Sequence, residues 1–158
     1  MAGVAVYRTG IAADWIDYNG HLRDAYYGLI VSLGLDALME RIGLDQAYRA
    51  RTTGTLYTLE MHMHYLREVK SDATVTAEVR ILGADRKRIH AAFDLMVEGQ
   101  AEPAACAETM LLHVQQKPTV SSALFPPEIA TAITRLQQST AALPASQFGS
   151  RQMQLPQR

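Results

Sequence analysis

The sequence predicts an α+β domain in which one long helix is buried within a curved antiparallel sheet. Residues 22–42 are apolar around most of a helix, and Ser32, Asp36 and Glu40 form a single narrow polar stripe. A helix of this kind must be covered on most sides, which favours a sheet that wraps around it. Downstream, apolar and polar residues alternate with the period of a strand, and turn residues separate the runs. The four predicted strands are residues 57–67, 74–81, 89–97 and 104–114.

Shorter elements complete the predicted domain. Residues 4–7, with a short continuation, predict a first strand ahead of the helix. The pair Pro126-Pro127 is typical of a helix start, and Leu143-Pro144 is expected to end that helix. We therefore expect one domain over residues 1–143, followed by a flexible tail, 144–158, which is rich in Gln, Ser and Pro.

Composition narrows the function classes. A chain of 158 residues that is 48% hydrophobic buries a substantial core without metal or disulfide staples. Its one cysteine, Cys106, excludes an intramolecular disulfide and is expected to be a buried structural thiol. The absence of a signal-like start predicts a cytoplasmic protein, and no apolar run suits a membrane. A net charge of -1 argues against a nucleic-acid partner.

A polar turn directly before the long helix carries the clearest chemical signal. Asp14, Asp17, Asn19 and Gly20 are turn formers, so Asp17 is expected to face the positive end of the helix. Free amides there can stabilise an oxyanion while a carboxylate attacks a carbonyl or activates water. The simpler interpretation is that Asp17 only caps the helix.

The string Asp17-Tyr18-Asn19-Gly20-His21, followed by a Tyr, resembles the signature of the hotdog-fold acyl-CoA thioesterases of the 4-hydroxybenzoyl-CoA thioesterase type. The resemblance implies that Asp17 is the nucleophile or general base, and that an amide near Arg23 or Asp24 holds the thioester oxygen. His21 is a further candidate, for orienting Asp17 or a water. Many relatives carry Asn-Asn where this chain has Arg23-Asp24. The family further implies a homodimer or homotetramer with the site between protomers, and no cofactor, since coenzyme A belongs to the substrate.

Aromatic residues around Asp24 suggest the acyl group. A carboxylate with aromatic rings forms a cage for a quaternary ammonium ion. The string Asp14 to His21, with Asp24 and Thr58-Leu59-Glu60, resembles the thioesterases of bacterial carnitine catabolism, which hydrolyse betainyl-CoA to glycine betaine and coenzyme A. The predicted acyl-binding residues are Asp24, Trp15, Tyr18, Tyr26 and Glu60, whereas Tyr27 is expected to pack in the core. Another short-chain or aromatic acyl-CoA, and a noncatalytic module that binds acyl-CoA or a quaternary amine, stay open as alternatives.

The phosphates of coenzyme A need cationic partners. Three consecutive basic residues at a predicted turn, Arg86, Lys87 and Arg88, are the first candidates, because arginine suits phosphate oxygens. Arg67 and Lys70 are lesser candidates. A solvated sheet edge is the plainer interpretation of the basic run.

A rival site lies on the first long strand after the helix. Alternation places Glu60, His62 and His64 on one face, opposite Met61 and Met63. Two histidines beside a carboxylate could hold a metal, but nothing marks a third ligand, so we predict no metal site. A polar outer face or a subunit contact is the alternative role.

Overall fold

The computed structural model describes residues 3–143. The predicted tail, 144–158, and the predicted helix stop at Pro144 lie outside the described residues. In chain order the elements are β1 (Val4–Gly10), the 3-10 helix η1 (Ala13–Trp15), α1 (Asp24–Ile42), α2 (Gln46–Thr52), β2 (Gly54–Tyr65), β3 (Thr74–Ala84), β4 (Arg88–Val97), β5 (Ala105–Gln115), β6 (Ser121–Ser122) and α3 (Pro127–Ser139).

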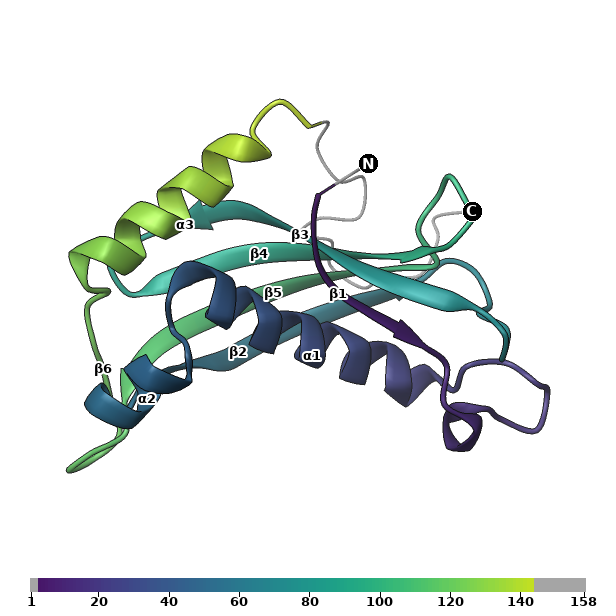
Figure 1. Cartoon of the computed structure of the whole chain (residues 1–158), viewed down its shortest axis with the longest axis horizontal. Coiled ribbons are helices and arrows are strands. Elements are labelled where there is room, and N and C mark those ends of the chain that lie inside the picture. Colours follow the sequence, from purple (N-terminus) through teal and green to yellow (C-terminus); the bar gives the residue numbers. More distant parts are fainter. Residues whose placement is uncertain (1–2, 144–158) are drawn as a thin grey trace, which may run out of the picture.

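One curved antiparallel sheet forms the body of the molecule. Its strand order is β1-β3-β4-β5-β2, with the short β6 paired to β5. Figure 1 shows α1 running along this sheet, which is the hotdog arrangement that the motif implied. The predicted meander holds only for β3, β4 and β5. Strand β2 pairs with β5 instead of β3, because β1 occupies the other edge of β3.

Helix α1 packs one broad face on the sheet. Gly34 allows a close approach, because a Cβ there would lie 3.1 Å from that of Ala77. The predicted polar stripe is confirmed, since Ser32, Asp36 and Glu40 are exposed. The buried side chains recur with helical spacing, as a helix packed on one side requires. They are Tyr27, Ile30, Val31, Leu35, Leu38, Met39 and Ile42, together with Gly34.

The predicted start of α1 is two residues too early. Leu22 is apolar and buried, but its amide donates to the carbonyl oxygen of Val69 at 2.8 Å, so it belongs to an extended segment. The helix begins at Asp24 and ends before Gly43, whose φ of 91° is the left-handed conformation common at helix ends. The apolar pattern alone could not separate a buried bridge residue from the first turn of a helix.

Two helices lie at the end of the sheet away from the start of α1 (Figure 1). Helix α2 was not predicted; Asp45 caps it by accepting a hydrogen bond from the Tyr48 amide at 2.7 Å. Helix α3 buries Ile129, Ile133 and Leu136 and ends at Ser139, before the predicted stop. In the described part of the chain, no helix is long and apolar enough to cross a membrane.

Cys106 is buried on β5, as predicted. Burial, together with a hydrogen bond to Asp94, raises the pKa of the Cys106 thiol to about 12. Asp94 also accepts a hydrogen bond from Arg80 at 3.0 Å, and both partners are buried. The thiol is therefore protonated at neutral pH and has no nucleophilic character there.

Candidate functional site

Asp17 is held by the amides of its own turn. Its Oδ1 accepts hydrogen bonds from the amides of Asn19 at 2.8 Å and His21 at 3.2 Å. The backbone closes the same turn, since the Asp17 amide donates to the His21 carbonyl oxygen at 2.8 Å. Gly20 provides the left-handed conformation, with φ of 82°, that this tight turn requires. Asp17 is thus oriented by the turn, and the interpretation of Asp17 as a simple helix cap is wrong.

These hydrogen bonds keep Asp17 ionised. The amide of His21 contributes most to lowering the pKa of the Asp17 carboxyl, and the amide of Asn19 adds to it. Hydrogen bonds to the charged form of a carboxylate favour ionisation. Asp17 therefore carries a full negative charge at neutral pH, as a nucleophile or proton acceptor must.

The turn is also fixed to the segment that follows β2. The ring Nε2 of His21 lies 3.3 Å from Oε2 of Glu68, and His21 forms a backbone bridge with Lys70. The sequence did not single out Glu68. A histidine held from both sides in this way is placed beside Asp17 without capping α1.

The two predicted oxyanion amides differ. The amide of Arg23 donates to the carbonyl oxygen of Trp15 at 2.9 Å and is therefore already occupied. The amide of Asp24 makes no hydrogen bond to any part of residues 3–143. It stands in the first turn of α1, where helix amides lack an internal partner and the helix dipole is positive. Of the two amides, only that of Asp24 is available to a ligand among the described residues.

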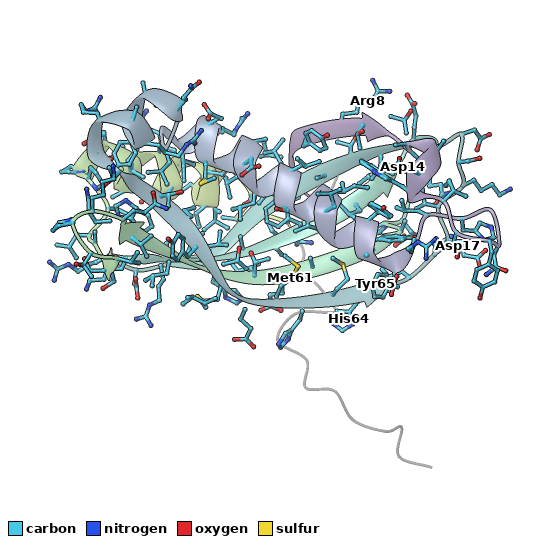
Figure 2. All side chains as sticks on the ribbon, turned by 90° about the horizontal axis from the view of Figure 1, so that it is seen from below. Arg8, Asp14, Asp17, Met61, His64 and Tyr65 are labelled. Carbon is cyan, nitrogen blue, oxygen red and sulfur yellow. The ribbon has the colours of Figure 1, made fainter. Side chains whose placement is uncertain are left out.

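Asp17 opens onto a pocket of about 380 Å³ at the start of α1. Figure 2 shows Asp17 and Tyr65 at this end of the molecule. The loop before α1, the first turns of α1, and the end of β2 with its following segment each contribute to the wall. The lining residues are Asp17, Asn19, His21, Leu22, Asp24, Tyr27, Tyr65, Leu66, Arg67 and Glu68.

The aromatic wall of the pocket differs from the predicted one. Tyr27 and Tyr65 line it, with ring centroids 5.3 Å apart and planes at 87°. Trp15 and Tyr26 instead stack on each other at 5.3 Å and 14°, and Tyr18 is 93% exposed; none of these three lines the pocket. A helix wheel cannot show that η1 turns Trp15 onto Tyr26. Strand alternation, which places Tyr65 on the face of Met61 and Met63, was the signal that could have found it.

The pocket is rich in negative charge. Asp17, Asp24 and Glu68 bring three carboxylates, whereas Arg67 is the one lysine or arginine among the lining residues. Like charges in a cleft raise the local concentration of oppositely charged ligand groups. These carboxylates therefore favour a cationic ligand group in the pocket.

The predicted phosphate-binding residues lie far from Asp17 within one chain. Arg86, Lys87 and Arg88 connect β3 to β4 at the end near α3, and the Arg86 carbonyl oxygen accepts a hydrogen bond from Phe125 (Figure 1). Strand β3 separates this turn from the Asp17 end by about 30 Å. Arg88 is also paired with Asp85 at 2.8 Å. Arg67, by contrast, lines the Asp17 pocket.

Glu60 and the two histidines of β2 lie outside the pocket. Nε2 of His62 is 2.8 Å from Oε1 of Glu60, and both side chains are exposed. In the described part of the chain, no group of three His, Cys, Asp or Glu side chains is arranged to hold a metal ion. Met61 and Met63 pack against the core, as the alternation predicted. Glu60 therefore does not line the Asp17 pocket of its own chain.

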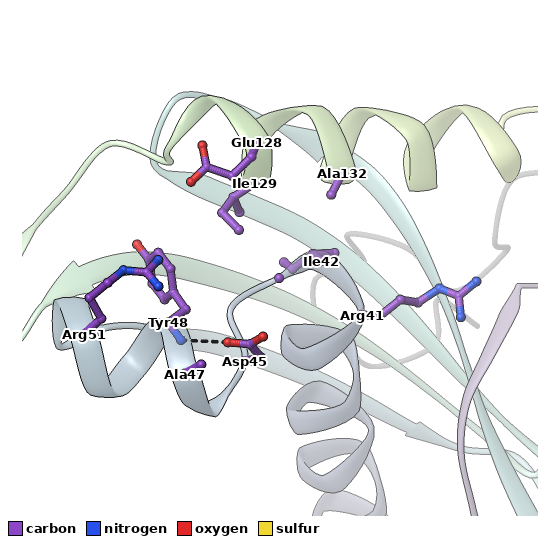
Figure 3. Close-up of a pocket in the computed structure, with 10 residues that line it drawn as sticks. Arg41, Ile42, Asp45, Ala47, Tyr48, Arg51, Glu128, Ile129 and Ala132 are labelled. Carbon is purple, nitrogen blue, oxygen red and sulfur yellow. Dashed lines mark hydrogen bonds between the residues drawn. The ribbon is translucent and has the colours of Figure 1, made fainter.

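A second pocket, of about 390 Å³, lies between the end of α1, α2 and α3 (Figure 3). Arg41, Arg51 and Glu128 stand around it, and the guanidinium of Arg51 lies 5.9 Å from the ring centroid of Tyr48. Asp45, the carboxylate nearest α2, is occupied in capping that helix. This pocket lies where three helices meet, and no residue of the Asp17 turn lines it.

The fold and the site together define a class of protein: a hotdog domain with an ionised carboxylate and a free helix amide at the mouth of an acidic pocket. Comparison with known families agrees, since residues 11–133 match the thioesterase-like superfamily. The chain belongs to this family.

Individual relatives extend the comparison. The betainyl-CoA thioesterase of Pseudomonas aeruginosa (strain PAO1) is 40% identical over 153 residues, which cover 97% of this chain and 96% of the relative. The L-carnitine dehydrogenase/betainyl-CoA thioesterase of Agrobacterium fabrum (strain C58) is 40% identical over 77% of this chain, which spans 25% of that longer protein. A Staphylococcus aureus protein solved in complex with CoA is 25% identical, with a TM-score of 0.89 over 99% of this chain and 98% of that one.

A crystal structure from Pseudomonas putida KT2440 is similar in both sequence and fold. It is 41% identical, with a TM-score of 0.86 over 99% of each chain. The match therefore covers nearly the whole chain.

Proposed function

We propose that this protein hydrolyses betainyl-CoA to glycine betaine and coenzyme A. The observation that carries the proposal is the 40% identity to a betainyl-CoA thioesterase across nearly the full length of both chains. The chemistry of the pocket supports it independently. Betaine carries a permanent trimethylammonium charge, and three carboxylates stand around the pocket in which the acyl group would lie.

The proposed reaction centres on Asp17. Its carboxylate either attacks the thioester carbon, giving a mixed anhydride that water then opens, or takes a proton from a water that attacks the same carbon. The free amide of Asp24 polarises the thioester oxygen in either route. The leaving group is a thiol, which is far more acidic than an alcohol (pKa about 8.5 for free cysteine), so it departs as a thiolate with little help from an acid. No further cofactor enters this scheme.

We further propose a homodimer formed through the edge strand β2. Within residues 3–143 this strand has no neighbour beyond β5, and Tyr57 and Leu59 on it are exposed apolar side chains. A two-fold axis pairs two such edges antiparallel. In this arrangement the end of the partner's sheet that carries α2 lies beside the Asp17 pocket. The partner's basic turn at Arg86 belongs to that same end of the sheet. This supports a role for that turn in binding the phosphates of coenzyme A across the interface.

We also propose a cytoplasmic location. The coenzyme A released by the reaction has a free thiol, which a reducing compartment keeps reduced, and the chain's single cysteine is unpaired.

The test is release of free thiol from three acyl-CoAs: betainyl-CoA, its neutral isostere 3,3-dimethylbutyryl-CoA, and 4-hydroxybenzoyl-CoA. We expect a kcat/KM for betainyl-CoA well above that for either neutral acyl group. Asp24→Asn, which keeps the side-chain shape and the backbone amide, is expected to lower hydrolysis of betainyl-CoA more than that of the isostere. Circular dichroism and thermal melting check that the variant is folded.

Other results of this assay would indicate a different substrate or function. Equal hydrolysis of betainyl-CoA and the isostere would contradict the proposed preference for a cationic acyl group and would indicate a thioesterase for short acyl groups. Preference for the hydroxybenzoyl thioester would indicate an aromatic substrate. Binding of betainyl-CoA without thiol release would indicate a noncatalytic module.

A further inference from the structure

Tyr65 ends the edge strand β2 at the mouth of the Asp17 pocket. The residue is 54% exposed. Its hydroxyl donates to the backbone carbonyl oxygen of Asp24 at 3.4 Å. The ring is therefore tied to the first turn of α1, next to the amide proposed to hold the thioester oxygen.

The ring of Tyr27 packs against the ring of Tyr65. The two rings meet edge to face, at 5.3 Å and 87°, and the hydroxyl of Tyr27 donates to the carbonyl oxygen of Arg67 at 3.2 Å. Tyr27 is only 4% exposed, so its faces are largely covered. Edge-to-face contacts fix the orientation of aromatic pairs. Within one chain, Tyr65 is therefore the ring whose face is open to a ligand.

We propose that Tyr65 is a specificity-determining residue whose ring contacts the trimethylammonium group of the acyl chain; this rests on the function proposed above. A quaternary ammonium has no N–H, so it cannot donate a hydrogen bond to a carboxylate. Aromatic faces recognise such a cation through its charge and its methyl surface. Asp24 and Glu68, which line the same pocket, add the negative potential that draws the cation towards the ring.

The other aromatic pair near α1 does not offer such a surface. Trp15 and Tyr26 are stacked almost parallel, so each covers a face of the other, and both pack against the core. Neither lines the pocket that contains Asp17. This geometry assigns the aromatic contact to Tyr65, a residue on a different element from those expected on sequence.

The test compares Tyr65→Leu with Tyr65→Phe, which keeps the aromatic face and loses only the hydroxyl. The readout is the ratio of kcat/KM for betainyl-CoA to that for 3,3-dimethylbutyryl-CoA, because a ratio cancels differences in the amount of active enzyme. We expect Tyr65→Leu to lower this ratio by about 2-fold to 30-fold, in the range of cation–π contacts. Tyr65→Phe is expected to keep most of the ratio, and Tyr26→Leu serves as the matched substitution on the stacked pair.

Several results would overturn the assignment. Equal losses for both substrates in Tyr65→Leu would indicate that Tyr65 only supports the helix start. A ratio lowered by Tyr26→Leu and not by Tyr65→Leu would move the contact to the stacked pair. These outcomes differ from failure of the proposed function, in which the wild-type protein shows no preference for betainyl-CoA or releases no thiol.

Discussion

Replacing Asp17 by Asn tests the centre of the mechanism, because the structure separates what Asn keeps from what it removes. The amide oxygen of Asn can still accept the hydrogen bonds from Asn19 and His21 that Oδ1 accepts at 2.8 and 3.2 Å. The turn should therefore stay in place. What disappears is the negative charge, and with it the ability to attack a carbonyl or to accept a proton.

The expected size of the effect follows from this separation. Loss of a positioned nucleophile or base lowers kcat by about 10²- to 10⁴-fold, while KM should change little because the pocket walls are unaltered. Thiol release under saturating betainyl-CoA measures kcat, and thermal melting measures whether the turn is intact. Asp17→Ala, which also removes the acceptor of both hydrogen bonds, should lower the melting temperature more than Asp17→Asn.

Asp14→Asn is the matched control. Asp14 lies in η1 of the same loop (Figure 2), is exposed and does not line the pocket. It loses the same charge and should keep nearly full kcat. If Asp17→Asn retained more than about a tenth of the wild-type kcat, or if Asp14→Asn lost as much, the assignment of Asp17 as the catalytic carboxylate would be wrong.

Three further predictions rest on titration. Because hydrogen bonds lower the pKa of Asp17, kcat/KM should stay level from pH 7 to 5 and fall only below the usual aspartate value of about 3.9; a fall centred near pH 6 would contradict this. Because the Cys106 thiol has a pKa of about 12, iodoacetamide at pH 8 should label it rapidly only after denaturation, and rapid labelling of the folded protein would show an accessible thiolate. Burial lowers the pKa of His113 in the folded protein. As pH falls below about 6.5, this histidine is therefore protonated more readily in the unfolded chain than in the folded one, and the free energy of unfolding should decrease. Denaturant titrations at pH 7 and 5.5 measure this slope, which His113→Gln should reduce.

The fold could be largely predicted because its determinants are periodic. Helical spacing over residues 22–42 and strand alternation after residue 57 depend on which side chains must leave water, and burial enforces that pattern along each element. The features that the sequence did not predict are a short helix and a strand pairing between residues far apart in the chain. The seven residues of α2 have a cap at Asp45 but too few turns for a clear apolar period. The pairing of β2 with β5 depends on which edge β1 occupies, and no local pattern records that.

In the candidate site, too, some features follow from the local sequence and others from the tertiary structure. The sequence by itself determined the acidic turn at Asp17, because turn formers and a glycine have local conformational preferences that need no distant partner. Only the tertiary structure decided which residues meet it. Tyr65 and Glu68 reach the pocket because β2 ends beside the start of α1, whereas Arg86 is carried to the far end by the length of β3. Local sequence specifies backbone turns and faces, but distances between faces are set by strand order and strand length, which the whole sheet determines together.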